Sequence, residues 1–215
     1  EACRELNKRF FTFHEKKRPY IILKWAQTND GFISQDPLPD CKEDNWITGA
    51  ESKQFVHQWR TQEQAILVGY NTAFLDNPVL TARLANGKNP LRIVIDKELA
   101  LPKHLAIFND DAETLIFNSK KSVQKNNLHY VKIDFNHLLT EMMNYLFTKN
   151  ISSIIIEGGT KTLSQFIKQN LWDEARVFVN PHKNFVKGLK APVISLSQAS
   201  KQFIGTDELY TLKNK

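Results

Sequence analysis

The sequence has few cysteines and no long apolar run, and each shortage excludes a class of protein. Only Cys3 and Cys41 occur among the 215 residues, too few for a disulfide framework or a cysteine-based zinc site. No apolar stretch approaches the roughly 20 residues that cross a bilayer. Residues 1–5 also lack the basic and then apolar pattern of a signal peptide. We therefore expect a cytoplasmic protein with ordinary reduced thiols and no membrane association.

Signatures of metal and nucleotide sites are missing too. The six histidines show no metal-ligand spacing, and no pair of nucleophile and base stands out, so we expect no metal. The G-x-G-x-x-G fingerprint of Rossmann domains is absent. A net charge of +6 favours an anionic partner, but the lysines are spread along the chain. A phosphorylated small molecule fits that charge as well as nucleic acid does.

The sequence does contain an alternation of apolar strands and helical stretches, with 41% hydrophobic and 24% charged residues, as in ordinary globular proteins. Continuous apolar runs are typical of strands covered on both faces, so we predict an α/β fold with a mainly parallel central sheet flanked by helices. After Asn180 the pattern changes, which favours loops and antiparallel C-terminal strands. The predicted strands are Tyr20–Trp25, Ala65–Gly69, Leu91–Asp96, Thr114–Asn118, His129–Ile133, Ser153–Glu157 and Ala175–Asn180, with a last apolar run at Glu208–Leu212.

Helical spacing of apolar residues predicts helices over Ala50–Gln62, His137–Phe147 and Thr162–Asn170. Thr48 followed by Glu51 resembles a capping box for the first of them. Residues 1–17 differ from the rest, with a short amphipathic helical stretch and a charged run, and are interpreted as a tail or linker.

The most informative segment is residues 153–165, an apolar strand that meets two glycines and then a helix. Bare backbone at Gly158 and Gly159, next to a helix N-terminus, is suited to cradle a phosphate. A simple tight turn explains the same pattern, and the two readings stay open. Glu157 ends the strand, where α/β sheets place ligands, although a solvated carboxylate is almost as well supported.

Other candidates have similar alternatives. Lys97, after Asp96 at a strand end, is a hypothetical selector of NADPH through the 2′-phosphate. Thr72 is interpreted as a cap of the next turn, and Asp76 as either a site residue or an Asx-turn residue. The guanidinium group of an arginine is suited to bind phosphate, but most arginines are surface charges.

Taken together, several motifs resemble the reductase domain of the bifunctional riboflavin biosynthesis protein, whose fold is similar to that of dihydrofolate reductase. The motifs occur in the family's order from about Arg18 to Pro181. They depart from it at the turn of residues 27–31 and after Pro181. The motifs that resemble the family are Arg18–Gly31, Trp46–Gly49, the block from Arg60 to Arg83, Pro90–Asp96 and Glu157–Thr160.

The resemblance implies NADPH as the cofactor and a role for each matching position. Lys24 and Asp76 are expected nearest the reacting carbon, where they position the sugar and help proton transfer. The residues implied for the cofactor are Ala26, Trp46, Thr72, Asp76, Lys97, Gly159, Thr160, Lys161, Thr162, Leu163, Ser164 and Gln165. Those implied for the substrate are Asp44, Arg60, Leu80, Arg83 and Glu157, with the two arginines on the ribose phosphate.

The family's deaminase half needs a His-x-Glu and a Cys-x-x-Cys zinc signature, and neither occurs in this sequence. Residues 1–17 are therefore interpreted as the remnant of a preceding deaminase domain, and residues 18–215 as the reductase domain. A homodimer is expected by analogy with the family.

The expected reaction is the NADPH-dependent reduction of the ribosyl group of 5-amino-6-(5-phosphoribosylamino)uracil to the ribitylamino product. The alternatives are a reductase of the same fold that acts on the non-deaminated diaminopyrimidinone or on a dihydropterin, or a basic module that binds nucleic acid.

Overall fold

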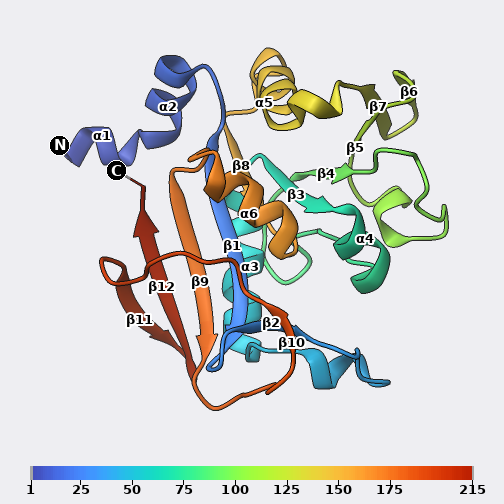
Figure 1. The fold of residues 1–215 in the computed structure, drawn as a ribbon. Coiled ribbons are helices and arrows are strands. Elements are labelled where there is room, and N and C mark those ends of the chain that lie inside the picture. Colours follow the sequence, from blue (N-terminus) through green and yellow to red (C-terminus); the bar gives the residue numbers. More distant parts are fainter. Residues whose placement is uncertain (1, 215) are drawn as a thin grey trace.

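A ten-stranded mixed sheet, most of it parallel, runs through the molecule in the order β11-β12-β9-β1-β8-β3-β4-β5-β7-β6 (Figure 1). The computed structural model describes residues 2–214, apart from the side chains of residues 42 and 43. A two-stranded sheet pairs β2 (Phe32–Gln35) with β10 (Gly188–Lys190). The strands of the large sheet are β1 (Tyr20–Thr28), β3 (Ala65–Gly69), β4 (Leu91–Ile95), β5 (Thr114–Asn118), β6 (Val123–Lys125), β7 (Leu128–Lys132), β8 (Ser153–Ile156), β9 (Glu174–Asn180), β11 (Ser200–Ile204) and β12 (Asp207–Lys213).

The predicted α/β class is confirmed, including the antiparallel strands after Asn180. Strands β1, β8, β3, β4, β5 and β7 are parallel neighbours, and β12 pairs with both β9 and β11 in the antiparallel sense. The bounds of the predicted strands differ from the observed ones by at most three residues, since β1 extends to Thr28. Four strands, β2, β6, β10 and β11, were not predicted individually. The first three have only three or four residues, which leaves little period to detect, and β11 is almost entirely exposed, so it has no apolar run.

Two hydrophobic cores lie on opposite faces of the sheet. The side chains of a strand alternate between its faces, so Ile21 belongs to one core and Ile22 to the other. The first core is covered by α5 (Leu138–Thr148) and α6 (Thr160–Lys168), and the second by α3 (Ala50–Gln62) and α4 (Tyr70–Asp76). Burial on both faces is the reason that Ile154–Ile156 is a continuous apolar run.

Helix α3 has the predicted bounds, but its predicted capping box is wrong. The N-cap is Gly49, which has no side chain to offer. The carboxylate of Asp207, from distant strand β12, instead accepts hydrogen bonds from Gly49 N (2.8 Å) and Ser52 Oγ (2.6 Å). The N-terminus of α3 is thus capped by a tertiary contact from Asp207 and not by Thr48 and Glu51, which the local sequence predicted.

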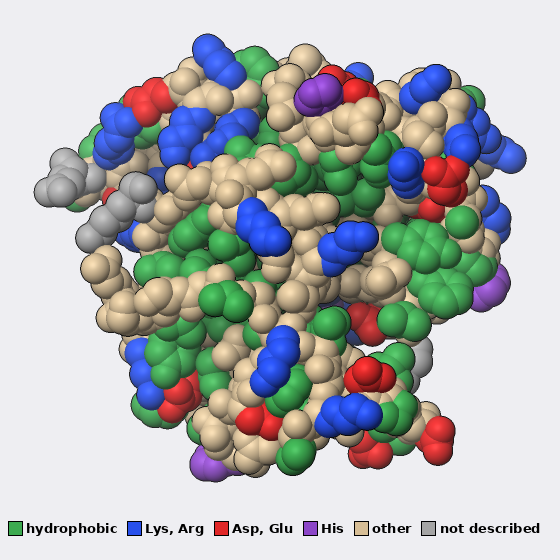
Figure 2. All heavy atoms as spheres, viewed as in Figure 1, with side chains coloured by type: hydrophobic (Ala, Val, Ile, Leu, Met, Phe, Trp, Pro, Cys, Tyr) green, Lys and Arg blue, Asp and Glu red, His purple; other side chains and the backbone are tan. Residues whose placement is uncertain are grey.

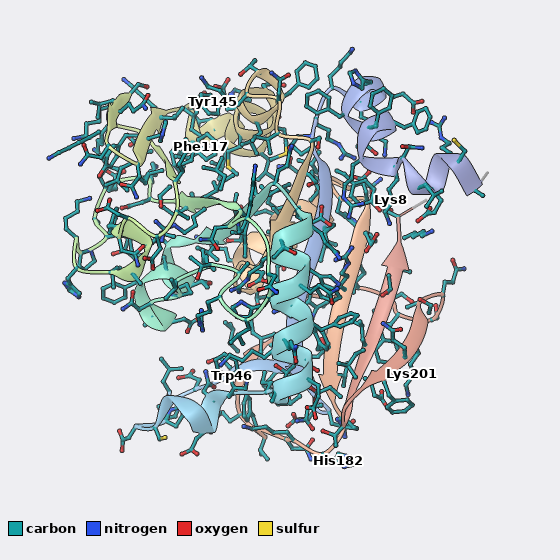
Figure 3. All side chains as sticks on the ribbon, turned by 180° about the vertical axis from the view of Figure 1, so that it is seen from behind. Lys8, Trp46, Phe117, Tyr145, His182 and Lys201 are labelled. Carbon is teal, nitrogen blue, oxygen red and sulfur yellow. The ribbon has the colours of Figure 1, made fainter. Side chains whose placement is uncertain are left out.

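The first residues are helical and packed against the sheet. Helices α1 (Ala2–Leu6) and α2 (Lys8–Lys16) precede β1. Lys8 Nζ lies 2.7 Å from the buried carboxylate of Glu174, and Arg9 Nε donates to Glu63 (2.7 Å). Figure 3 shows that Lys8 and Trp46 lie toward opposite ends of the sheet. Helix α2 is part of this folded unit, and its origin as a deaminase remnant stays a prediction.

Within residues 2–214, every helix is too short or too polar to cross a bilayer.

Candidate active site

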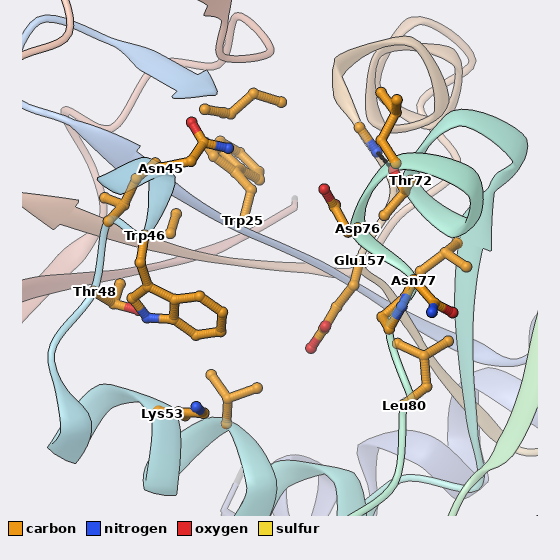
Figure 4. A pocket seen from close by; sticks show the side chains of 18 of the residues that line it. Trp25, Asn45, Trp46, Thr48, Lys53, Thr72, Asp76, Asn77, Leu80 and Glu157 are labelled. Carbon is orange, nitrogen blue, oxygen red and sulfur yellow. Dashed lines mark hydrogen bonds between the residues drawn. The ribbon is translucent and has the colours of Figure 1, made fainter. Parts of the chain in front are cut away.

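A pocket of about 580 Å³ opens at the carboxyl ends of β1, β8 and β3. Its floor is made by the strand ends, one wall by α3 and the opposite wall by α4 and the loop that follows it. Figure 4 shows Glu157 pointing into the space between Trp46 on one side and Asn77 and Leu80 on the other. Parallel strands end at the same edge, so residues far apart in sequence meet there.

The floor carries a buried cluster of charges. In the register of β1 and β8, Leu23 faces Ile156, which places Lys24 beside Glu157 at the next position. Lys24 Nζ lies 3.8 Å from Glu157 Oε1. Arg60 Nη2 donates to Glu157 Oε2 at 2.9 Å, and Arg60 Nη1 donates to the carbonyl of Thr81 at 3.0 Å. Glu157 Oε1 accepts no hydrogen bond, so one carboxylate oxygen remains available to a ligand.

Burial and mutual charge shift the pKa values of this cluster. Burial alone would raise the pKa of Glu157, but Arg60 and Lys24 hold it below its ordinary value. Burial lowers the pKa of the Lys24 ammonium, an effect that Arg60 reinforces and Glu157 opposes. A buried lysine with a lowered pKa next to an ionised carboxylate is suited to proton transfer.

Helix α3 turns one face toward the pocket. Lys53, Val56, His57 and Arg60 all line it, at the spacing of i, i+3, i+4 and i+7 that shares one side of a helix. His57 is only 2% exposed, and its Nδ1 has no hydrogen-bond partner. Burial, with the charges of Arg60 and Arg83, lowers the pKa of His57 to about 4. His57 is therefore neutral near pH 7.

The glycine corner, formed by Gly158 and Gly159 between β8 and α6, is open to the pocket, which a phosphate site at these glycines would require. Gly158 and Gly159 line it, and α6 begins with Gly159 as an N-cap that gives no side-chain hydrogen bond. The N–H of Gly159 donates to Thr72 Oγ1 at 3.0 Å. Thr72 itself lies within α4, whose N-cap is Gly69, so the predicted role of Thr72 as a cap is wrong. A Cβ on Gly158 would lie 2.6 Å from Thr162 Cβ, so close packing of α6 explains this glycine.

The structure brings most of the predicted site residues to one pocket. Asp44, at the end of the short 3₁₀ helix Lys42–Asn45, does not line it. Lys97 follows β4 at the same sheet edge but lies outside the pocket lining, with its Nζ 5.7 Å from the centre of the Phe135 ring. Residues 160–165 form the first part of α6, where Thr160 Oγ1 donates to the carbonyl of Lys190. The predicted residues that line the pocket are Lys24, Ala26, Trp46, Arg60, Thr72, Asp76, Leu80, Arg83, Glu157 and Gly159.

Sequence reasoning missed several charged or polar residues of the pocket, among them Lys53 and His57 on the α3 wall. Lys53 Nζ lies 4.6 Å from the centre of the Trp46 ring, a cation–π contact at the pocket mouth. A signal for both was present, because they precede Arg60 by seven and three residues on a predicted helix. Only Arg60 among the polar side chains of that helix was predicted to belong to the site.

A comparison with known protein families identifies the family of this chain. The family model described as the RibD C-terminal domain matches residues 19–183. The chain belongs to this family. The matched span includes every residue that lines the pocket, from Lys24 in β1 to Gly159 at the start of α6.

Relatives in the RibD family have two kinds of name. The chain is 36% identical over 189 residues to the riboflavin biosynthesis protein RibD of Aquifex aeolicus, with 84% of this chain and 51% of that protein covered. It is 32% identical over 178 residues to the 2,5-diamino-6-ribosylamino-4(3H)-pyrimidinone 5′-phosphate reductase of Methanothermobacter thermautotrophicus, with 76% and 78% covered. The chain thus spans about half the length of the RibD protein from Aquifex.

A solved structure agrees with the fold. The Thermotoga maritima protein named diaminohydroxyphosphoribosylaminopyrimidine deaminase/5-amino-6-(5-phosphoribosylamino)uracil reductase superposes with a TM-score of 0.84 at 28% identity. The match covers 99% of this chain and 61% of that protein.

Proposed function

We propose that the chain is an NADPH-dependent reductase of riboflavin biosynthesis that converts 5-amino-6-(5-phosphoribosylamino)uracil to its ribitylamino product. One observation carries the proposal: residues expected to hold the cofactor and residues expected to hold the substrate line a single pocket of about 580 Å³. Hydride transfer needs the two molecules in contact, away from bulk water. The names of the RibD relatives support the choice of pathway.

The pocket fits a dinucleotide at the glycine corner. Gly158 and Gly159 bring no side chains to it, and α6 starts there without a side-chain cap. The Gly159 N–H is taken by Thr72 Oγ1, so the amides proposed for a pyrophosphate are those of the first turn of α6. Trp46, half exposed at the opposite side, offers a flat apolar face. Lys97 lies at the carboxyl end of neighbouring strand β4, where an adenosine 2′-phosphate would extend. When bound, NADPH supplies a hydride to C1′ of the sugar.

The residues of the floor handle the accompanying protons. Opening of the ribose breaks the bond between C1′ and O4′, O4′ takes a proton, and the exocyclic nitrogen forms a double bond to C1′ as its own proton leaves. Hydride addition at C1′ returns the electron pair to that nitrogen, which is protonated again. Lys24 is the proposed donor to O4′. Burial lowers the pKa of its ammonium, which eases loss of the proton, and the nearby Glu157 opposes that shift. Asp76 faces the same space and is proposed to orient the sugar.

The phosphate is assigned to the side of the pocket next to Arg83. Arg83 is exposed and makes no ion pair or hydrogen bond with the described residues 2–214. Arg60, in contrast, already binds Glu157 and Thr81, so it positions the floor rather than reaching outward. On the face shown in Figure 2, Lys and Arg side chains lie scattered among polar and apolar ones and form no continuous stripe, as suits a small phosphorylated ligand.

A second candidate substrate is the non-deaminated pyrimidinone. The pyrimidinone reductase of M. thermautotrophicus aligns over 78% of its own length, which favours this substrate as much as the RibD names favour the uracil. The experiment that tests both measures the rate of NADPH oxidation by the purified chain with each compound in turn. The same assay with NADH in place of NADPH tests the choice of cofactor. Turnover of the uracil at the higher kcat/KM supports the proposal. Preference for the pyrimidinone reassigns the substrate, and turnover of neither by folded protein rejects the reductase assignment.

A further inference from the structure

His57 is the buried titratable group of the pocket that the proposed reaction leaves unused. It comes from the pocket face of α3, four residues after Lys53 and three before Arg60. The ring is almost completely buried, and Nδ1 has no partner. A buried ring nitrogen without a hydrogen bond is costly in a folded protein unless a ligand or a water supplies one.

The charges around His57 come from every wall of the pocket. Lys53 and Arg60 lie on its own helix, Arg83 on the loop after α4, and Glu157 on the strand floor; the three cations lower its pKa and the carboxylate raises it. Lys24 and Asp76 line the same pocket farther along. Glu157 is already paired with Arg60, so His57 faces an excess of positive charge.

We propose that His57 is a conditional cation of the substrate's phosphate site: its ring is neutral while the pocket holds no anion and takes up a proton when a phosphate dianion binds beside Arg83. The proposal rests on the proposed function, which puts the phosphate in this pocket. Three cations and one carboxylate leave an excess of two positive charges around the ring, and a dianion cancels it. Burial, the largest cause of the lowered pKa of His57, still opposes protonation, but an anionic partner beside the imidazolium offsets that cost.

This arrangement makes recognition of the phosphate selective. A permanent cation in place of His57 would destabilise the empty pocket through repulsion with Arg60 and the other cations around it. A group that is charged only in the complex adds a charge-assisted contact without that repulsion. An unphosphorylated ribose brings no negative charge and does not recruit the proton.

The test is the number of protons exchanged when ribose 5-phosphate binds to the full chain. Isothermal titration calorimetry at about pH 7.5, where a phosphate monoester with a second pKa of about 6 is mostly a dianion, is repeated in buffers of different ionisation enthalpy. We expect uptake approaching one proton per ligand bound. Cations acting on the phosphate alone would release protons, so the sign separates His57 from the ligand. Ribose without phosphate is the ligand control.

The variant that removes the titrating group is His57→Gln, whose amide still forms hydrogen bonds but carries no charge. It is expected to bind ribose 5-phosphate about tenfold more weakly and to exchange no proton. His137→Gln is the matched control, because His137 is exposed, pairs with Asp134 and lies outside the pocket. If His57→Gln does not fold, NMR of the ring nitrogens in histidine-labelled wild-type protein gives the same answer: one of the six histidines changes from neutral ring to imidazolium on saturation.

The outcomes separate the two proposals. Binding that depends on Arg83 but occurs without proton uptake, or with uptake that persists in His57→Gln, overturns the role of His57 and leaves the proposed function intact. Failure of ribose 5-phosphate to bind, or binding that is unchanged in Arg83→Ala, removes the phosphate site from this pocket, and the role of His57 with it.

Discussion

Arg60 Nη2 lies 2.9 Å from Glu157 Oε2, and both side chains are nearly sealed from solvent at the floor of the pocket. The pair joins α3 to the end of β8, and the other Arg60 nitrogen extends the connection to the loop at Thr81. Three segments of the pocket are therefore fixed by one guanidinium. This makes Arg60 a positioning residue whose loss acts on stability as well as on activity.

Arg60→Ala is expected to lower the free energy of unfolding by about 3–5 kcal/mol, the usual cost of leaving a buried charge unpaired. Urea denaturation of the variant and of wild type measures the difference. The double variant Arg60→Ala/Glu157→Gln should recover part of the loss, because it removes the uncompensated carboxylate. A loss below about 0.5 kcal/mol would mean that the pair contributes no more than an exposed salt bridge.

Arg83→Ala should leave the free energy of unfolding unchanged, since Arg83 is exposed and has no partner within residues 2–214. Its expected effect is on substrate binding, with a loss of about 1.5–3 kcal/mol that appears in KM for the phosphorylated substrate. Lys88→Ala, an exposed cation five residues further along the chain, is the control for general charge. An unchanged KM would contradict the phosphate assignment.

Asp76→Asn is expected to reduce kcat by about 10²–10⁴-fold while the thermal melting temperature stays within a degree or two. The residue lies exposed on the rim of the pocket at the end of α4, outside the core, and its proposed role is to orient the sugar. Steady-state kinetics and a melting curve on the same preparation separate the two effects. Asp110→Asn, on a surface loop far along the chain, should change neither. A lowered melting temperature with normal kcat would indicate a purely structural Asp76.

The two glycines of the corner should respond differently to alanine. In Gly158→Ala the new methyl would lie 2.6 Å from Thr162 Cβ, so we expect a loss of about 1–3 kcal/mol of stability from overpacking. In Gly159→Ala the nearest atom is Thr72 Oγ1 at 3.4 Å, which predicts a smaller loss of stability but about tenfold weaker NADPH binding. Denaturation and a fluorescence titration with NADPH test the pair. Equal effects of the two variants on both quantities would refute this division.

His57 should make stability depend on pH in a defined window. Its pKa is about 4 in the folded protein and 6.5 in the unfolded chain. Between these values the unfolded chain binds more protons, so the free energy of unfolding rises with pH from about 4 to 6.5, by at most about 1.4 kcal/mol per pH unit. The difference between wild type and His57→Gln in denaturation at several pH values isolates this contribution. A constant difference across the window would show that His57 titrates normally.

The sequence by itself determined the α/β class, most strands and the exact extent of α3, because apolar runs and helical spacing are local properties that follow from burial. The motifs around Lys24, Arg60, Asp76 and Glu157 also predicted a candidate site, and the structure brings these four residues to one pocket. Residue pattern was enough for these predictions, since parallel strands bring their ends together whatever the details of packing.

Only the tertiary structure decided how those residues are used. Three contacts join segments separated by dozens of residues: Asp207 caps α3, Thr72 Oγ1 accepts a hydrogen bond from Gly159, and Arg60 binds Glu157. The neutral state of His57 depends likewise on its burial and on cations brought to it from its own helix and from the loop after α4. Charges and hydrogen bonds act through space, so their partners are set by the packed fold and not by spacing along the chain.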